Sequence, residues 1–132
     1  MGAEQFGTRS SGKTVEEAFE EAREQAFYDH GHAGYTGTIA EKTSFHEVKL
    51  PTGVTAQEFL GWLEGYRTPP EVYNTATRRY ERTGAEHFDP ETPEHLKQEI
   101  RTAYAIYDDK WGPALAIQTR PNQWLFTGWA SS

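Results

Sequence analysis

The densest collection of chemically versatile side chains lies in one ten-residue stretch, 29–38, with the sequence DHGHAGYTGT. Residues two apart in an extended chain point to the same side, so His30 and His32 are spaced like a His-x-His pair that chelates zinc or iron. The glycines indicate a different chemistry, because their amides, with threonine hydroxyls, suit a phosphate or a carboxylate. A third interpretation is a helix stop followed by a turn into a strand. The candidate ligand-binding residues of this stretch are His30, His32, Gly34, Tyr35, Thr36, Gly37 and Thr38.

A metal site would need more ligands than this pair of histidines provides. The side chains with suitable chemistry elsewhere are Glu41, His46, His87 and Asp89. Nothing in the sequence places them near the pair, and no second spaced pair supports a metal site. A divalent metal at His30 and His32 is therefore an alternative, and no cofactor is predicted.

Arginines and tryptophans form a second set of candidates. Arg78 and Arg79, with Tyr80 beside them, suit phosphates and carboxylates, because guanidinium groups bind these anions bidentately and stack on rings. In the last turns of a helix the same cations would instead complement the helix dipole. Trp111 and Trp129 are candidates for the wall of a binding cleft, although such rings more often belong to a core.

Residues 7–14, GTRSSGKT, match the pattern of a phosphate-binding loop, and helix signals follow them. In such a loop the backbone amides surround phosphates at a helix N-terminus. The loop must follow a buried hydrophobic strand, but only the six residues MGAEQF precede the match. The favoured interpretation is a polar lead-in, residues 1–13, that at most adds a short edge strand and ends where Thr14 caps a helix.

Four segments begin with signals typical of helix starts. Threonine followed three residues later by glutamate is a capping box, and proline is favoured in the first turn. The signals are Thr14 with Glu17, Thr55 with Glu58, Thr68 with Glu71, and Thr92-Pro93. They predict helices over 15–30, from 55 to Gly65, from 68 to Gly84 and from 92 to Tyr107, each with apolar residues at helical spacing.

Shorter runs of β-favouring residues predict four strands. These runs are 35–41, 45–50, 113–119 and 123–129, and the turn residues Arg120-Pro121-Asn122 join the last two as a hairpin. Helices and strands do not alternate regularly, which disfavours a parallel doubly wound sheet. We therefore expect an α+β fold with an antiparallel sheet of about four strands packed with about four helices.

Composition narrows the class of protein. At 132 residues and 15.0 kDa the chain fits a single domain over 1–132. The absence of cysteine excludes disulfides, thiolate metal sites and a cysteine nucleophile. A net charge of −7 argues against nonspecific binding to nucleic acid. No secretory signal and no apolar run long enough for a membrane span are visible, so we expect a cytoplasmic protein without a membrane partner.

Two blocks, GYTGTIAEK at 34–42 and GWASS at 128–132, resemble segments of small uncharacterised proteins from bacteriophages and related actinobacterial genomes. The resemblance covers mainly 14–45 and 107–132 and implies no activity. It implies an origin in a mobile element, where small proteins often inhibit host factors or sequester host signalling molecules. A phage-encoded protein of this kind would act in the host cytoplasm.

The residues favour a non-catalytic binding protein over an enzyme, because no set of nucleophile, base and orienting group stands out. Its expected partner is a small anionic, nucleotide-like ligand that it sequesters, or a host protein that it inhibits. The pocket would combine the 29–38 stretch with the arginines and the late tryptophans. The alternative is a small metal-dependent hydrolase centred on His30 and His32. Assembly into a homo-oligomer is left open.

Overall fold

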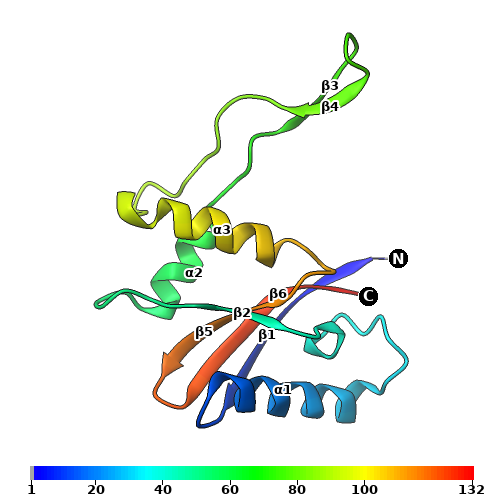
Figure 1. The fold of residues 1–132 in the computed structure, drawn as a ribbon, viewed down its shortest axis with the longest axis vertical. Helices are drawn as coiled ribbons and strands as arrows, with labels where there is room; N and C mark the ends of the chain where they lie inside the picture. The colour runs from blue at the N-terminus through cyan, green and yellow to red at the C-terminus, as the bar shows by residue number, and fades with distance from the viewer. Residues whose placement is uncertain (1) are drawn as a thin grey trace.

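The computed structural model describes residues 2–132, which form three α-helices, a four-stranded sheet and a separate two-stranded hairpin. Figure 1 shows the sheet between α1 on one side and α2 with α3 on the other, and the hairpin standing off at one end. The elements are β1 (Ala3–Ser11), α1 (Val15–His30), β2 (Phe45–Val48), α2 (Ala56–Glu64), β3 (Glu71–Asn74), β4 (Arg79–Arg82), α3 (Lys97–Tyr107), β5 (Ala114–Arg120) and β6 (Gln123–Ser131), with 3₁₀ turns at Ile39–Glu41 and Glu94–Leu96. The expected α+β class is confirmed.

The sheet has the strand order β1-β6-β5-β2 and is mixed. β6 pairs antiparallel with both β1 and β5, whereas β2 runs parallel to β5. The prediction of a wholly antiparallel sheet is therefore wrong for β2. The reason is the connection, since a strand can return parallel to another only through a long crossover, here one that contains α2, the hairpin and α3.

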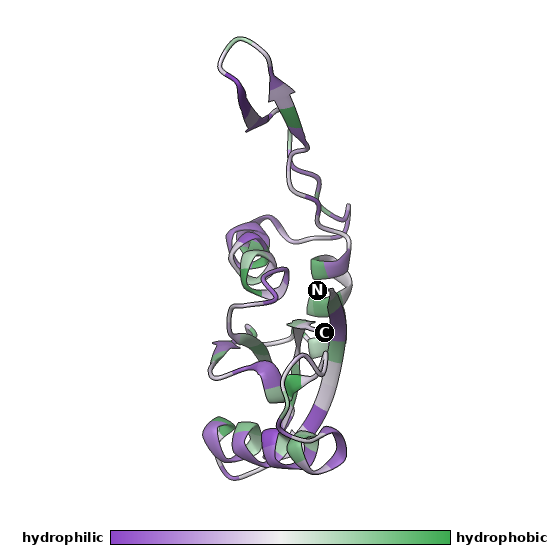
Figure 2. Cartoon of the chain, turned by 90° about the vertical axis from the view of Figure 1, so that its right-hand side faces the viewer, coloured by the Kyte–Doolittle hydropathy of each residue, from purple (hydrophilic) through white to green (hydrophobic). Residues whose placement is uncertain are grey.

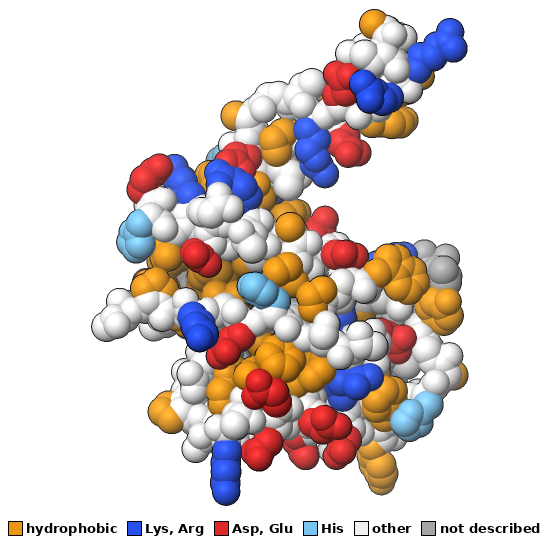
Figure 3. Space-filling model, in the orientation of Figure 1, with side chains coloured by type: hydrophobic (Ala, Val, Ile, Leu, Met, Phe, Trp, Pro, Cys, Tyr) orange, Lys and Arg blue, Asp and Glu red, His pale blue; other side chains and the backbone are white. Residues whose placement is uncertain are grey.

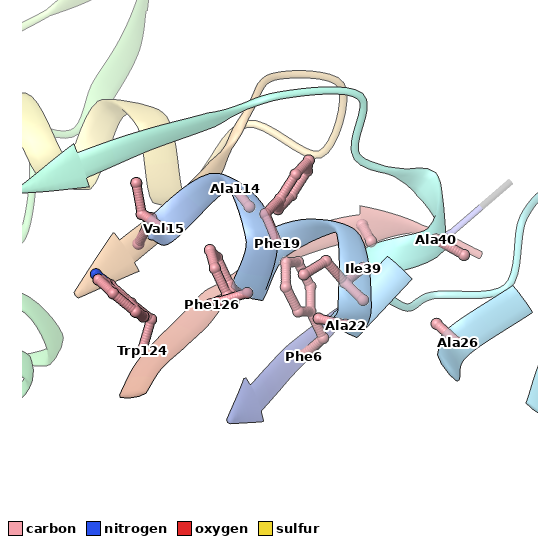
Figure 4. Close-up of a cluster of buried hydrophobic side chains, with 13 residues drawn as sticks. Phe6, Val15, Phe19, Ala22, Ala26, Ile39, Ala40, Ala114, Trp124 and Phe126 are labelled. Atoms are coloured by element: carbon pink, nitrogen blue, oxygen red, sulfur yellow. The ribbon is translucent and has the colours of Figure 1, made fainter. Parts of the chain in front are cut away.

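Each face of the sheet has its own core. Strand β5 alternates between them: Ala114 and Ala116 belong to the core under α1, while Leu115 and Ile117 belong to the core under α2 and α3. In the first core the small side chains let α1 lie close to the sheet, and the rings of Phe6, Phe19, Trp124 and Phe126 fill the remaining space (Figure 4). In the second, aliphatic strand residues meet the rings and aliphatic side chains Phe59, Trp62, Leu63, Tyr66 and Ile100.

The first two predicted helices are confirmed, and local hydrogen bonds explain where they start. Thr14 accepts a bond from the Glu17 amide at 3.2 Å, and the Lys13 amide donates to the Glu17 carboxylate at 2.9 Å. At α2 the reciprocal capping box of Thr55 and Glu58 is complete. The last predicted helix is also present, although its first turn, from Glu94 to Leu96, is 3₁₀ and α3 itself begins at Lys97.

The helix predicted over 68–84 is wrong, because this segment forms the β3–β4 hairpin. Val72 and Tyr73 favour an extended chain, and Asn74 then starts a turn. Its side-chain oxygen accepts bonds from the amides of Ala76 and Thr77, at 2.9 and 3.3 Å. Those amides are therefore held in a turn, and the chain reverses instead of continuing as a helix.

Two further predictions concern the N-terminal third. The strand expected over 35–41 is wrong, because the structure has a loop there and then the Ile39–Glu41 turn. The lead-in expected over 1–13 contains β1, a nine-residue edge strand that pairs with β6 along its length. The C-terminal hairpin is confirmed as β5 and β6. Within residues 2–132, no helix has the length and apolar character needed to cross a membrane.

Candidate functional site

The histidine and glycine stretch forms the end of α1 and the loop after it. His30 is the last residue of α1, and the imidazole of His32 stacks on the ring of Phe27, with centroids 4.3 Å apart and planes at 6°. This stacking turns His32 back onto the helix. Among residues 2–132 there is no group of three or more His, Asp or Glu side chains that could hold a metal ion.

The threonines and amides of this loop surround a carboxylate that the chain itself provides. The amides of Tyr35 and Thr36 donate to Glu41 at 3.0 and 3.3 Å, and the Thr36 hydroxyl donates to the same carboxylate at 2.8 Å. The Thr38 hydroxyl lies 2.7 Å from that of Thr36 and also caps the Ile39–Glu41 turn. An anion binding here would have to displace Glu41, because one carboxylate already accepts these three donors.

The stretch that matches a phosphate loop is extended in this structure. Residues 7–11 belong to β1 and pair with β6, and the Gly12 amide donates to the Asn122 carbonyl at 3.1 Å. Successive amides of a strand point to opposite sides, so they cannot converge on one phosphate as a phosphate loop does. The match in sequence is thus not accompanied by the loop's structure.

The two candidate tryptophans lie in different surroundings. Trp111 is 62% exposed in the loop before β5. Trp129 is partly buried and lines a depression of about 460 Å³ with Gln5, Tyr104 and Tyr107. The Gln5 amide donates to the Tyr107 hydroxyl, which spans the floor of this depression. Burial raises the pKa of Tyr107, so the phenol is neutral at physiological pH.

A buried lysine fixes the loop that carries Trp111. Lys42 is only 1% exposed, and its ammonium donates to the carbonyls of Asp109, Lys110 and Gly112 at 3.2, 3.3 and 2.9 Å. Three donors meet three acceptors, which satisfies the buried cation. Burial lowers the pKa of Lys42, and the charge of Asp109 opposes this shift. Lys42 thus anchors the entry to β5 to the Ile39–Glu41 turn.

Arg78 and Arg79 lie at the tip of the β3–β4 hairpin, which we call the arm. Figure 1 shows the arm at one end of the molecule and α1, with His30, at the other. In the view turned by 90°, the arm again extends away from the rest of the chain (Figure 2). The structure therefore does not bring the arginines together with the histidine stretch, and the single pocket expected from the sequence is not assembled from them.

The base of the arm is fixed to the body by a polar cluster. Glu86 accepts bonds from the Arg101 guanidinium on α3, with Nε at 2.9 and 3.1 Å from its two oxygens, and from the Tyr66 hydroxyl at 2.6 Å. These bonds, first those from Arg101, lower the pKa of Glu86 to about 2. A backbone bridge between Arg67 and His87 closes the two legs of the arm next to this cluster. Of these residues, Glu86, Arg101 and Tyr66 were not candidates from the sequence.

Beyond this base, the side-chain hydrogen bonds, ion pair and ring contact of the arm within residues 2–132 are formed among its own residues. The rings of Tyr73 and Tyr80 pack edge to face across the two strands, with centroids 5.2 Å apart and planes at 62°. They remain 47% and 70% exposed, and Val72 on the other face of the arm is 51% exposed. A two-stranded hairpin is marginal in water when nothing packs against it. The shaft of the arm therefore presents apolar surface that the body does not cover.

The charges of the arm are only partly neutralised within it. Glu81 accepts bonds from Asn74 and from Thr77, which lower its pKa, and Glu71 lies 3.8 Å from Arg82. Both acidic side chains of the arm thus already have partners. The remaining cations of the tip, Arg78 and Arg79, form no ion pair with any of residues 2–132.

The tip itself is built at a conformational cost. Arg78 has φ +56°, in the left-handed region that glycine or asparagine normally occupies. Its amide donates to the Asn74 carbonyl at 2.8 Å, which closes the four-residue turn 75–78. A residue with a Cβ costs about 1 kcal/mol or more in this conformation. A long, exposed cation thus stands at the tip of the arm, where a glycine would adopt the backbone conformation more readily.

Comparisons of the chain with models of protein families, with curated proteins and with solved structures find no match. The resemblance to phage and actinobacterial proteins therefore stays a prediction.

Proposed function

We propose that the protein is a non-catalytic binding protein and that the β3–β4 arm is its contact element, which grips an acidic surface of a protein partner. The observation that carries this proposal is the arm itself: a hairpin anchored at its base, uncovered along its shaft and tipped by two unpaired arginines. Of the two partners expected from the sequence, this favours a protein over a small anionic ligand.

The composition of the arm suits a protein interface. Tyrosine and arginine are enriched among residues that contribute most to binding energy, because they combine a large apolar surface with polar groups. Tyr73 and Tyr80 supply that surface on one face of the hairpin, and Arg78 and Arg79 supply the cations at its end. Figure 3 shows hydrophobic and basic side chains, with some acidic ones, along the projecting part of the molecule.

Charge distribution favours an acidic protein rather than a nucleic acid. Residues 67–82 carry four arginines and two glutamates, which is a net charge of +2. Since the whole chain has a net charge of −7, the other residues together carry −9. Nucleic-acid binding needs an extended positive surface, and the arm offers only a short one. An acidic patch of limited size on a protein needs only the two unpaired cations at the tip of the arm.

Site-specific photo-cross-linking tests the proposal directly. p-Benzoylphenylalanine is placed at Tyr80 or at Trp111, which is 62% exposed but lies in the loop before β5. The full chain is produced in its native cells and irradiated. We expect a discrete protein adduct from position 80, lost in Arg78→Glu/Arg79→Glu, and none from position 111. Equal adducts from both positions, or none from position 80, would overturn the proposal.

A further inference from the structure

We propose that the acidic surface gripped by the arm lies on a second copy of this chain, in the trough between the outer edge of β1 and helix α1. This inference rests on the proposed function of the arm and names its partner. The trough has a volume of about 690 Å³ and lies on the α1 side of the sheet. The end of β1 and Gly12, residues 8–12, line one wall, and the helix wall consists of Glu17, Glu20, Glu21, Ala22, Glu24 and Gln25.

The sheet has an unpaired edge at β1. Strand β1 is nine residues long and pairs only with β6, so every second residue directs its backbone N–H and C=O away from the sheet. The two strands of the arm also pair only with each other, which leaves both outer edges of the hairpin free. A strand of the arm can therefore extend the sheet beyond β1, a common mode of recognition.

The charges along that edge are complementary to those of the arm. Helix α1 contains six acidic residues and one arginine, a net charge of −5. The four glutamates of the helix wall, Glu17, Glu20, Glu21 and Glu24, form no ion pair with residues 2–132, and Arg9 is the one cation among the described residues that lines the trough. The arm tip brings the two cations that lack partners in their own copy. The arm arginines of each copy can thus pair with the trough glutamates of the other copy.

An aromatic residue extends this acidic face of α1. In a helix, residues 17, 21, 24 and 28 fall on one side because they repeat at three or four positions. Tyr28 therefore extends the trough face by one turn beyond Glu24, and it is 87% exposed, more than any other large hydrophobic side chain among the described residues. An arm seated with its arginines against the glutamates would bring its own tyrosines toward this ring.

The arrangement in space allows both arms to be used at once. The arm and α1 lie at opposite ends of the long axis of the molecule (Figure 1). Two copies placed side by side and antiparallel would each lay an arm against the other's trough, which is a closed twofold dimer. Contact between two arms is disfavoured, because it would bring like-charged arginines together.

Sedimentation equilibrium of the full chain tests this pairing. We expect a reversible dimer that weakens on going from about 50 to about 500 mM salt, since screening shortens the reach of surface charges. Arg78→Glu/Arg79→Glu and Glu20→Lys/Glu24→Lys should each weaken self-association at least tenfold. An equimolar mixture of the two variants should restore dimers, because each charge reversal complements the other. The matched control, Glu91→Lys/Glu99→Lys, reverses two exposed glutamates outside the trough and should not weaken the dimer.

Several outcomes would overturn the inference. If the wild-type chain stays monomeric up to about 500 µM, far above the Kd of a specific interface, a second copy is excluded as the partner. Stronger association of Arg78→Glu/Arg79→Glu would indicate contact between arms, and failure of the mixture to dimerise would exclude the trough. The arm variant lies outside both cores, so its folding is not at risk. A Tyr80 adduct with another protein, together with a monomeric wild type, would leave the proposed function standing without this partner.

Discussion

The anchor at the base of the arm makes the stability of the protein depend on pH through one residue. Glu86→Gln keeps the size of the side chain and an oxygen acceptor for the Tyr66 hydroxyl, but it removes the charge that Arg101 binds. Hydrogen bonds to a charged group contribute about 1.5–3 kcal/mol when buried. The side chains of Arg101 and Glu86 are 42% and 25% exposed, so solvent screening reduces this contribution. We expect the substitution to lower the free energy of unfolding by about 1–2 kcal/mol at pH 7.

The sign of the pH dependence follows from the direction of the shift. The pKa of Glu86 falls from its ordinary value of 4.5 to about 2 in the folded protein, mainly because of the bonds from Arg101. An acid with a depressed pKa stabilises the folded state above its unfolded pKa, and this contribution is lost as the pH falls toward the folded value. The difference between wild type and Glu86→Gln should therefore be complete above pH 4.5 and shrink as the pH falls to about 2.

Urea unfolding of both proteins, followed by circular dichroism from about pH 7 to about pH 3, measures this difference. Glu81→Gln is the matched control, because Glu81 also has a lowered pKa but accepts its bonds within the arm. Because these bonds lie within the arm and not between the arm and the body, it should lower the global free energy of unfolding less than Glu86→Gln does at pH 7. The reasoning is refuted if Glu86→Gln matches wild type at pH 7, or if its deficit is as large near pH 3 as at pH 7.

Three further predictions concern residues that the structure places under constraint. Lys42→Met should lower the free energy of unfolding by about 2–3 kcal/mol in urea titrations, because carbonyls of the loop before β5 lose their donor. Gly37→Ala should cost more in thermal melts than Gly31→Ala: both have positive φ, but only at Gly37 does the added Cβ meet another side chain, 2.6 Å from an oxygen of Glu4. Arg78→Gly should stabilise the free hairpin by about 1 kcal/mol. The temperature dependence of the NMR chemical shifts of the hairpin would show this stabilisation. In the photo-cross-linking experiment, the same substitution should decrease the adduct formed from position 80.

The parts of the fold that the sequence predicts correctly are those that local chemistry determines. Helices α1 and α2 begin at threonine caps whose hydrogen bonds span three residues, and the turn between β5 and β6 is set by Arg120-Pro121-Asn122. In each case the deciding contact lies within a few residues along the chain. Strand β1 is different, because only Phe6 of its nine residues is buried and its partner strand begins more than a hundred residues later.

The error in the arm has a geometric origin. Tyr73 and Tyr80 are seven residues apart, which places them on one face of a helix after two turns. The same separation places them directly opposite each other across a hairpin with a four-residue turn, as in the structure. The spacing therefore fits both, and the side chain of Asn74, which holds the turn amides, decides between them. The proline pair at 69–70 and the β-branched residues nearby were the available signals.

The residues of the site that the sequence did not reveal depend on distant partners. Lys42 binds carbonyls 67 to 70 residues away, and Glu86 meets Tyr66 and Arg101 from 20 and 15 residues away. No spacing rule connects such pairs, because the fold and not the local chain brings them together. The trough has the same origin, since it joins the N-terminal strand to a helix whose acidic face, taken alone, indicates only solubility.

Two features of the arm are unfavourable in free energy, and contacts with the body do not compensate for them. Its apolar rings remain in water, and Arg78 holds a backbone conformation that disfavours it. At the same time the bonds of Glu86 fix the base of the arm, so its direction is set before any partner arrives. We propose that such an element, which the fold positions at its base but does not cover along its shaft, contacts another molecule. Because the arm and the body have opposite net charges, that contact is strongest with a surface like the body's own, which is why a second copy is the partner to test first.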